Sequence, residues 1–480
     1  YLTKKQLRRK VRTNINNNYK FVAYIKLAND IKRQTNWNGD ENLITDKVKQ
    51  IIKKRYSNRV IIIDEVQNIR DETQQDKMVP PIIEAMIKYS DNVKLILMSA
   101  TPMYHSPREI IYILNLMLCV DKKPLLNEED IFDNQDNITP KGRQILIEKS
   151  KGYVSYLKGE NPYTFPIKLI PNEARVLDEV KIDINNKFIP KDERLKEVKI
   201  IPCYMSNFQY QGYLDILESS KSSVSHIMML SNITYKTKSD KHIKPDNSYK
   251  DIYSGSDNGN GAFVREVKKL KIRKRKIINF KYQKHMIYNR GEKNEKPFLD
   301  EEHIGNFSTK FAECLKNIKR SKGLVLVFTR FITAGILPFS LMLEQNGFSR
   351  YEENDLLDYE KNRKGGGGKS QICYKCSNEL SNEIHKDQSL KGYHRYSQSQ
   401  YIAITGSELT KYNPETATSI FNRPENMYGK NVKVIIGGES IREGINFMNV
   451  RQIHIIDPWH NLSKLEQIIG RSIRNCSHKN

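Results

Sequence analysis

The chain has 480 residues, and its 80 lysines and arginines outnumber its 56 aspartates and glutamates, giving a formal net charge of +24 and a pI near 9.5. This charge favours a polyanionic partner such as nucleic acid, although abundant Asn, Ile, Lys and Tyr equally fit a lysine-rich, AT-biased genome. No apolar run is long enough to span a bilayer, so we expect no membrane partner, and six mostly isolated cysteines fit a reducing compartment.

The first informative element is the apolar run 60–63, which predicts a buried parallel strand leading into Asp64 and Glu65. Open α/β sheets place their ligand chemistry at the carboxyl ends of strands. Hydrolysis of ATP needs a carboxylate that holds Mg²⁺ and a polar group that orients the attacking water. We assign Asp64, acting through water, to the metal and Glu65 to the attacking water. The plain alternative is an acidic turn after a strand.

A second apolar run, 93–98, predicts another strand that leads into the small polar turn Ser99-Ala100-Thr101. The hydroxyls of Ser99 and Thr101 can couple a phosphate site to a second domain. A three-residue turn is weak evidence for this role by itself. Its position in the chain, after the acidic pair, strengthens the interpretation.

The region 121–320 is less readable. The tract near 239–261 is polar and rich in Gly and Ser, which predicts a disordered loop. The run 264–276 follows, with Lys or Arg at eight of thirteen positions. On a helix, this run could contact a phosphate backbone, and a solvated face or a nuclear-import-like patch is the alternative. The candidate contacts are Lys271, Arg273, Lys274 and Arg275.

The strands expected next cover 323–330, ending in Thr329 and Arg330, then 401–406 and 432–437, the last followed by a Gly-containing loop. An insert near 351–400 separates the first two. It contains a C-x-x-C knuckle and two histidines, a set that could complete a tetrahedral zinc site and staple a segment poor in apolar residues. Unrelated free cysteines and histidines are the alternative. The four candidate ligands are Cys373, Cys376, His385 and His394.

The segment 450–478 carries the strongest pattern. An apolar run, 453–456, predicts a buried strand. The following helical stretch holds Gln467, Gly470, Arg471 and Arg474. Because the two arginines are three positions apart, we expect both on one helical face, where guanidinium groups can contact nucleotide phosphates across a domain gap.

A phosphate-binding loop is missing from these patterns. The sequence Gly368-Lys369-Ser370 fails the pattern G-x-x-x-x-G-K-[ST], because position 363 is Arg and no apolar strand precedes it. We interpret this Gly-rich run as a flexible tether. The chain begins without Met, so we expect a fragment whose phosphate loop lies upstream and which alone turns over little ATP.

In order, these segments resemble motifs of superfamily 2 helicases: the DExx form of Walker B, motif III (SAT), motif IV, motif V and motif VI (Q-x-x-G-R-x-x-R). Together with 151–166, 202–213 and 306–318, they are similar to the SNF2-like helicases of nucleocytoplasmic large DNA viruses. These include the poxvirus early transcription factor small subunit, nucleoside triphosphate phosphohydrolase I and mimivirus-type homologues. The resemblance implies nucleic-acid contacts by Thr329, Arg330 and Ser440, and a place near ATP for Gly444, Gln467 and Gly470.

We therefore expect an α/β protein with two RecA-like parallel-sheet domains, 1–120 (truncated) and 321–480, joined by a mostly helical insertion, 121–320. The resemblance implies an ATP- and Mg²⁺-dependent DNA translocase or helicase in viral transcription, whose partners are DNA or RNA and a viral RNA polymerase or transcription factor subunit. Its expected location is the host-cytoplasmic viral factory or the virion. A cellular RNA helicase or chromatin remodeller, and a catalytically silent nucleic-acid-binding module, remain alternatives.

Overall fold

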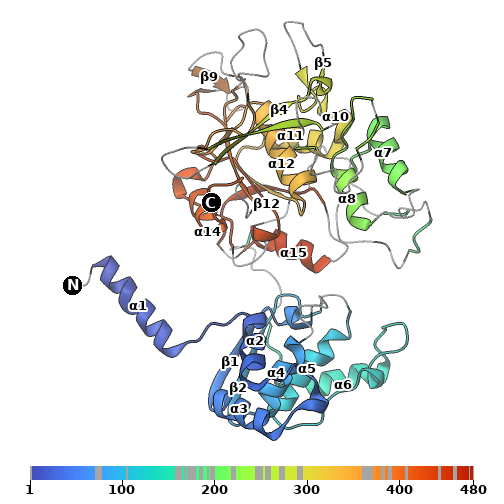
Figure 1. Cartoon of the computed structure of the whole chain (residues 1–480), viewed down its shortest axis with the longest axis vertical. Coiled ribbons are helices and arrows are strands. Elements are labelled where there is room, and N and C mark those ends of the chain that lie inside the picture. Colours follow the sequence, from blue (N-terminus) through green and yellow to red (C-terminus); the bar gives the residue numbers. More distant parts are fainter. Residues whose placement is uncertain are drawn as a thin grey trace. The chain divides into compact units, whose positions relative to one another are not determined.

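In the computed structural model the chain forms two compact units, Tyr1–Gly159 and Glu160–Asn480 (Figure 1). The residues that the structure describes are 3–70, 78–103, 106–156, 165–166, 169, 180–182, 187–191, 194, 200–217, 223–239, 241–243, 252–253, 261–269, 276–288, 296–358, 371–379, 384–387, 392–405, 409–441, 445–457, 462–474 and 476–478. No helix among them is both long enough and apolar enough to cross a bilayer.

Unit 1 is built on a parallel pair of strands, as the two apolar runs predicted. β1 (Arg59–Asp64) and β2 (Val93–Met98) pair in a register that sets Asp64 opposite Met98. Ile63 and Leu95 point into a core shared with the surrounding helices. These helices are α2 (Tyr24–Thr35), α3 (Asp46–Tyr56), α4 (Val79–Lys88) and α5 (Glu109–Val120).

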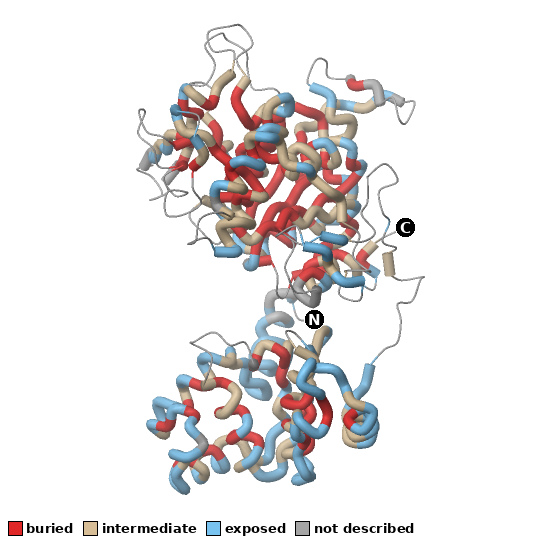
Figure 2. Tube along the Cα trace, turned by 90° about the vertical axis from the view of Figure 1, so that its right-hand side faces the viewer, coloured by how far each residue is buried: buried red, intermediate tan, exposed pale blue. Residues whose placement is uncertain are grey.

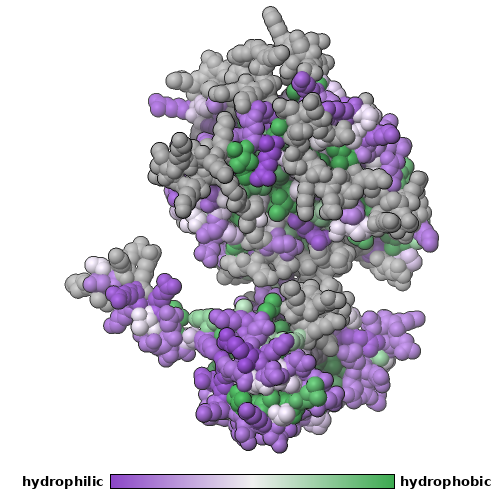
Figure 3. All heavy atoms as spheres, in the orientation of Figure 1, coloured by the Kyte–Doolittle hydropathy of each residue, from purple (hydrophilic) through white to green (hydrophobic). Residues whose placement is uncertain are grey.

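The other face of this sheet is exposed. Val60, Ile62, Ile96 and Met98 are between 42% and 59% exposed, although parallel sheets normally have both faces covered. Two further helices, α1 (Lys4–Asn18) and α6 (Pro140–Ser150), complete the unit. The face of unit 1 drawn in Figure 3 is mainly hydrophilic, with a smaller hydrophobic area.

Unit 2 contains the parallel sheet expected of a RecA-like domain. Its described strands are ordered β13-β7-β12-β11-β8 and all pair in parallel. Their bounds are β7 (Leu324–Phe328), β8 (Ser349–Arg350), β11 (Gln400–Ile404), β12 (Val434–Gly437) and β13 (Val450–Ile455).

Both faces of this sheet are buried, which explains its continuous apolar strands. Along β7, Val325 and Val327 join one core, while Leu324, Leu326 and Phe328 join another. Buried positions accordingly concentrate in the interior of unit 2 (Figure 2). The helices after the central strands are α12 (Leu337–Gln345), α14 (Pro414–Phe421) and α15 (Leu462–Gly470). The predicted α/β class with a RecA-like sheet is confirmed.

The segment ahead of β7 mixes helices with hairpins. Its helices are α7 (Asn207–Leu217), α8 (Val224–Asn232), α10 (Ile304–Phe307) and α11 (Thr309–Arg320), and its strands are β3 (Phe263–Lys269), β4 (Lys276–Tyr282), β5 (Ile287–Tyr288) and β6 (Lys296–Pro297). The prediction of a helix for the basic run 264–276 is wrong. The residues of this run that the structure describes lie in the antiparallel β3–β4 pair. There Phe263 and Phe280 alternate with polar residues and bury an aromatic face.

Disorder was predicted for the tract near 239–261, and that prediction is wrong at its apolar residues. Ile252 is completely buried and Tyr253 is 5% exposed. The Tyr253 hydroxyl donates to the Thr333 carbonyl at 2.7 Å, and its ring stacks on Phe263. The polar composition of the tract did not indicate that Ile252 and Tyr253 would be buried in unit 2. Residues 240, 244–251 and 254–260 of this tract lie outside the described residues.

Candidate functional site

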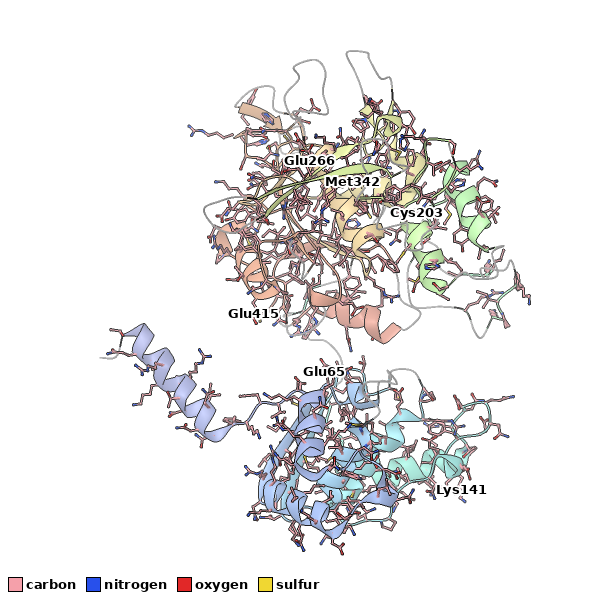
Figure 4. The ribbon with its side chains drawn as sticks, in the orientation of Figure 1. Glu65, Lys141, Cys203, Glu266, Met342 and Glu415 are labelled. Carbon is pink, nitrogen blue, oxygen red and sulfur yellow. The ribbon has the colours of Figure 1, made fainter. Side chains whose placement is uncertain are left out.

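The acidic pair of unit 1 lies where β1 ends, and Figure 4 labels Glu65 at that edge of the unit. The Asp64 side chain is exposed, and its Oδ1 accepts the Glu65 N–H at 3.0 Å. Glu65 has a φ of 52°, a left-handed conformation that costs a non-glycine residue energy and is concentrated at functional sites. The bend turns the chain sharply directly after the strand.

Hydrogen bonds link this pair to the turn after β2. The Gln67 amide donates to Glu65 Oε2 at 2.6 Å, and the Ser99 hydroxyl donates to Gln67 Oε1 at 2.6 Å. The Thr101 N–H then donates to Ser99 Oγ at 3.0 Å. The structure thus brings together the four predicted residues of unit 1, through Gln67.

Gln67 is the residue that the motif pattern left without a role. It is 6% exposed and carries both side-chain bonds of the link. An amide suits this place because it donates to a carboxylate and accepts from a hydroxyl at the same time. In the sequence, its position two residues after the acidic pair was the feature that could have indicated this linking role.

The predicted arginine face needs correction. α15 ends at Gly470, so Arg471 and Arg474 lie beyond the last helical residue and do not share a helical face. A turn at 471–473 follows the helix, and the Arg474 N–H donates to Ser477 Oγ at 3.2 Å. Arg471 is 6% exposed, while the Arg474 side chain is exposed and its Nε donates to the Gly470 carbonyl at 3.1 Å.

The other motif VI residues lie on α15. Gln467 is partly buried, and its carbonyl accepts the Arg471 N–H at 3.2 Å. A Cβ added at Gly470 would meet nothing within 4 Å, so this glycine borders open space. Arg474 is therefore the arginine that can reach a ligand without rearrangement.

The end of β7 carries a buried polar network centred on Asp457, just beyond β13. Asp457 is 2% exposed; its Oδ2 accepts the Arg330 N–H at 2.8 Å and its Oδ1 accepts the Asn232 amide at 3.2 Å. Burial raises the pKa of this carboxyl. Thr329 is completely buried and Arg330 is partly exposed, and their contact with nucleic acid stays a prediction.

Asp457 is a residue that the sequence prediction missed. The signal was present, because an acidic residue ends an apolar strand here as Asp64 does in unit 1. The remaining predicted contacts cannot be placed. Gly444 and the basic candidates Lys271, Arg273, Lys274 and Arg275 lie outside the described residues, as does the side chain of Ser440.

The Cys and His residues of the insert come together. β9 (Ile384–Asp387) and β10 (Gly392–Arg395) form an antiparallel hairpin in which His385 pairs directly with His394. Cys373 Sγ lies 3.3 Å from His394 Nε2, and Cys376 Sγ lies 3.2 Å from His385 Nδ1. All four potential ligand atoms lie within 4.8 Å of one another.

Comparison with known proteins defines the class of the chain. Residues 368–476 match the helicase conserved C-terminal domain, which covers the β11–α15 part of the parallel sheet. The chain thus contains a match to the helicase C-terminal domain and is similar to helicases and transcription factor homologues of large DNA viruses.

Three relatives illustrate this similarity. A proposed ATP-dependent RNA helicase of Acanthamoeba polyphaga mimivirus is 26% identical over 445 residues, 88% of this chain and 36% of that protein. In African swine fever virus (isolate Tick/Malawi/Lil 20-1/1983), an early transcription factor large subunit homologue is 22% identical over 450 residues, 90% of this chain and 36% of that protein. In the same isolate, a termination factor NPH-I homologue is 22% identical over 431 residues, 87% of this chain and 53% of that protein. The chain therefore spans only part of the length of each relative.

Proposed function

We propose that the protein is part of an ATP-dependent DNA translocase or helicase that acts in the transcription of a large DNA virus. The observation that carries the proposal is the hydrogen-bonded link from Glu65 through Gln67 and Ser99 to Thr101. It joins an acidic pair suited to ATP hydrolysis to a turn suited to signalling the nucleotide state. Both sit at the carboxyl ends of parallel strands, where such sheets bind ligands.

The chain offers a carboxylate that could hold Mg²⁺, but its sequence contains no loop of the usual pattern that could bind the phosphates of ATP. Asp64 offers an exposed carboxylate at the strand end, and Mg²⁺ in such sites is held by one or two carboxylates, phosphates and water. The 480 residues contain no G-x-x-x-x-G-K-[ST] loop to bind the phosphates. We propose that a segment outside this chain supplies the loop, and the exposed apolar face of β1 and β2 suits contact with additional structure.

In the proposed cycle, Asp64 would hold Mg²⁺, which would supply positive charge against the developing negative charge, and Glu65 would orient the attacking water. Arg474, and Arg471 after a rearrangement that exposes it, would contact nucleotide phosphates. Repeated binding and hydrolysis of ATP would then move the protein along nucleic acid. The net charge of +24 supports a nucleic-acid partner.

ATP hydrolysis tests the proposal. In the full-length protein, Glu65→Gln is expected to lower the DNA-stimulated turnover by about 100-fold or more, while nucleotide binding persists. The exposed carboxylate variant Glu129→Gln is the matched control and should leave turnover unchanged. Equal turnover of Glu65→Gln and the unchanged protein would refute the assignment.

DNA as the preferred nucleic acid is part of the proposal. The names of the African swine fever virus relatives, an early transcription factor and a termination factor, support a place in transcription and a viral polymerase or transcription factor as partner. The name of the mimivirus relative favours RNA instead. Turnover stimulated more by RNA than by DNA would favour an RNA helicase, and nucleic-acid binding without turnover would favour a silent binding module. We also propose a location in the viral factory or the virion.

A further inference from the structure

The Cys/His cluster of unit 2 has the composition and geometry of a metal site. Two sulfurs come from the knuckle 373–376, and two imidazoles come from facing positions of the β9–β10 hairpin. A tetrahedron with Zn–S near 2.3 Å and Zn–N near 2.05 Å has S···N edges of about 3.5 Å. The two S···N distances of 3.3 and 3.2 Å lie close to such edges. We propose that Cys373, Cys376, His385 and His394 bind one structural Zn²⁺.

Two of the four ligands are buried and two are partly buried. Cys373 is completely buried and His385 is 5% exposed, whereas Cys376 and His394 are intermediate. The centroid of the Tyr396 ring lies 5.4 Å from that of the His385 ring. Two thiolates and two neutral imidazoles balance the charge of one Zn²⁺, and sulfur–nitrogen sets in tetrahedral array select zinc over Mg²⁺ or Ca²⁺.

Lys433 joins the knuckle to the parallel sheet. This lysine, directly before β12, is completely buried, and its ammonium donates to the Tyr374 carbonyl in the middle of the knuckle at 2.9 Å. The contact fixes the backbone between Cys373 and Cys376 against the sheet.

The position of the site in the sheet indicates a structural role. Lys433 and the Cys373–Gln398 bridge lie at the amino ends of β12 and β11. Arg330 and Asp457 follow the carboxyl ends of β7 and β13, at the opposite edge of the same parallel sheet. Within unit 2, β9 and α15 accordingly lie far apart in Figure 1. All four positions of the tetrahedron are protein ligands, which leaves none for a substrate.

The knuckle is also attached to the core of unit 2. The Tyr374 N–H donates to the Ser397 carbonyl at 2.9 Å, and the Ser377 hydroxyl donates to the Lys319 carbonyl at the end of α11 at 2.6 Å. Zinc would therefore hold the β9–β10 hairpin on a knuckle that is already joined to β12 and α11. The insert, polar in sequence, gains a fixed position without an apolar core of its own.

Metal analysis of the freshly purified chain tests this inference and needs no ATPase activity. We expect about one zinc per chain, and Co²⁺ substitution should give the visible absorption and sulfur charge-transfer bands of a tetrahedral site with two thiolates. Cys373→Ser should remove the metal, while Cys203→Ser, a matched cysteine of unit 2 outside the cluster, should retain it. Chelation should increase hydrogen exchange in 371–379 and 384–395 more than in 462–470.

A second variant shows whether metal loss in Cys373→Ser comes from the missing ligand or from misfolding. His394→Cys keeps four ligands but changes the set to three sulfurs and one nitrogen, so it should retain the metal and strengthen the sulfur-to-cobalt bands. A chain without zinc and without a tetrahedral cobalt spectrum would overturn the inference. So would a His394→Cys protein whose cobalt spectrum matches that of the unchanged chain, or a disulfide between Cys373 and Cys376 in the freshly purified protein.

Discussion

The replacement Gln67→Met tests whether the link between the two strand ends of unit 1 couples them. Methionine has nearly the volume of glutamine and removes both hydrogen bonds without opening a cavity. The bond to the Glu65 carboxylate is charge-assisted and contributes about 1.5 to 3 kcal/mol, and the bond from Ser99 contributes about 0.5 to 1.5 kcal/mol. Since Glu65 is only partly buried and Ser99 is exposed, water replaces part of both. We therefore expect a loss of about 2 kcal/mol in the free energy of unfolding of unit 1.

Urea unfolding of the 480-residue chain, followed by the fluorescence of Trp37 in the core of unit 1, measures this loss. Asn68→Ala, in the same short helix Val66–Arg70, is the matched control and should change stability by less than about 0.5 kcal/mol. A double-mutant cycle with Ser99→Ala should give a coupling energy of about 0.5 kcal/mol or more. Additive effects of the two changes would refute the link.

The remaining predictions concern pH, nucleic acid and turnover. Burial raises the pKa of Glu344, and the nearby Asp355 carboxylate adds to this effect. The unfolded chain therefore ionises first, and the folding stability of unit 2 falls as pH rises above the ordinary pKa of 4.5. Glu344→Gln should reduce that slope in unfolding titrations, and an unchanged slope would contradict the prediction. Alanine at Lys271, Arg273, Lys274 and Arg275 should weaken DNA binding and flatten the dependence of log K on log salt, whereas an unchanged slope would exclude the basic run from the interface. The chain as given should show little or no ATP turnover with DNA, and robust stimulated turnover would show that it binds phosphates without the expected loop.

Local patterns explain which parts of the fold were predictable. β1, β2, β7, β12 and β13 were visible because each is an apolar run that ends in a polar turn. The β3–β4 pair was mistaken for a helix because its basic residues dominate the pattern and its buried phenylalanines are few. The end of α15 was missed because a three-residue spacing indicates a face only while the helix continues.

In the candidate sites, too, only the residues that form local patterns were predictable. Asp64 and Glu65, or the C-x-x-C knuckle, are short contiguous signals that the sequence exposes directly. The partners that complete them are distant along the chain. Lys433 lies 59 positions from Tyr374, and Asn232 lies 225 positions from Asp457. No spacing rule relates such residues, because their proximity is created by the parallel sheet and the segments packed on it.

The network around Asp457 shows how the segment ahead of β7 is joined to the parallel sheet of unit 2. Asn232 from α8 donates to Asp457, and the ammonium of Lys310 from α11 donates to Asn232 Oδ1 at 3.1 Å. Burial lowers the pKa of Lys310, and Asp457 opposes this effect. The segment thus supplies two buried polar groups to the sheet edge that also holds Arg330. Replacing Asp457 with Asn would leave the Arg330 N–H with a weaker acceptor and Lys310 without its countercharge. Because α8 and α11 are connected to Arg330 through Asp457, movement of either helix should alter the position of Arg330.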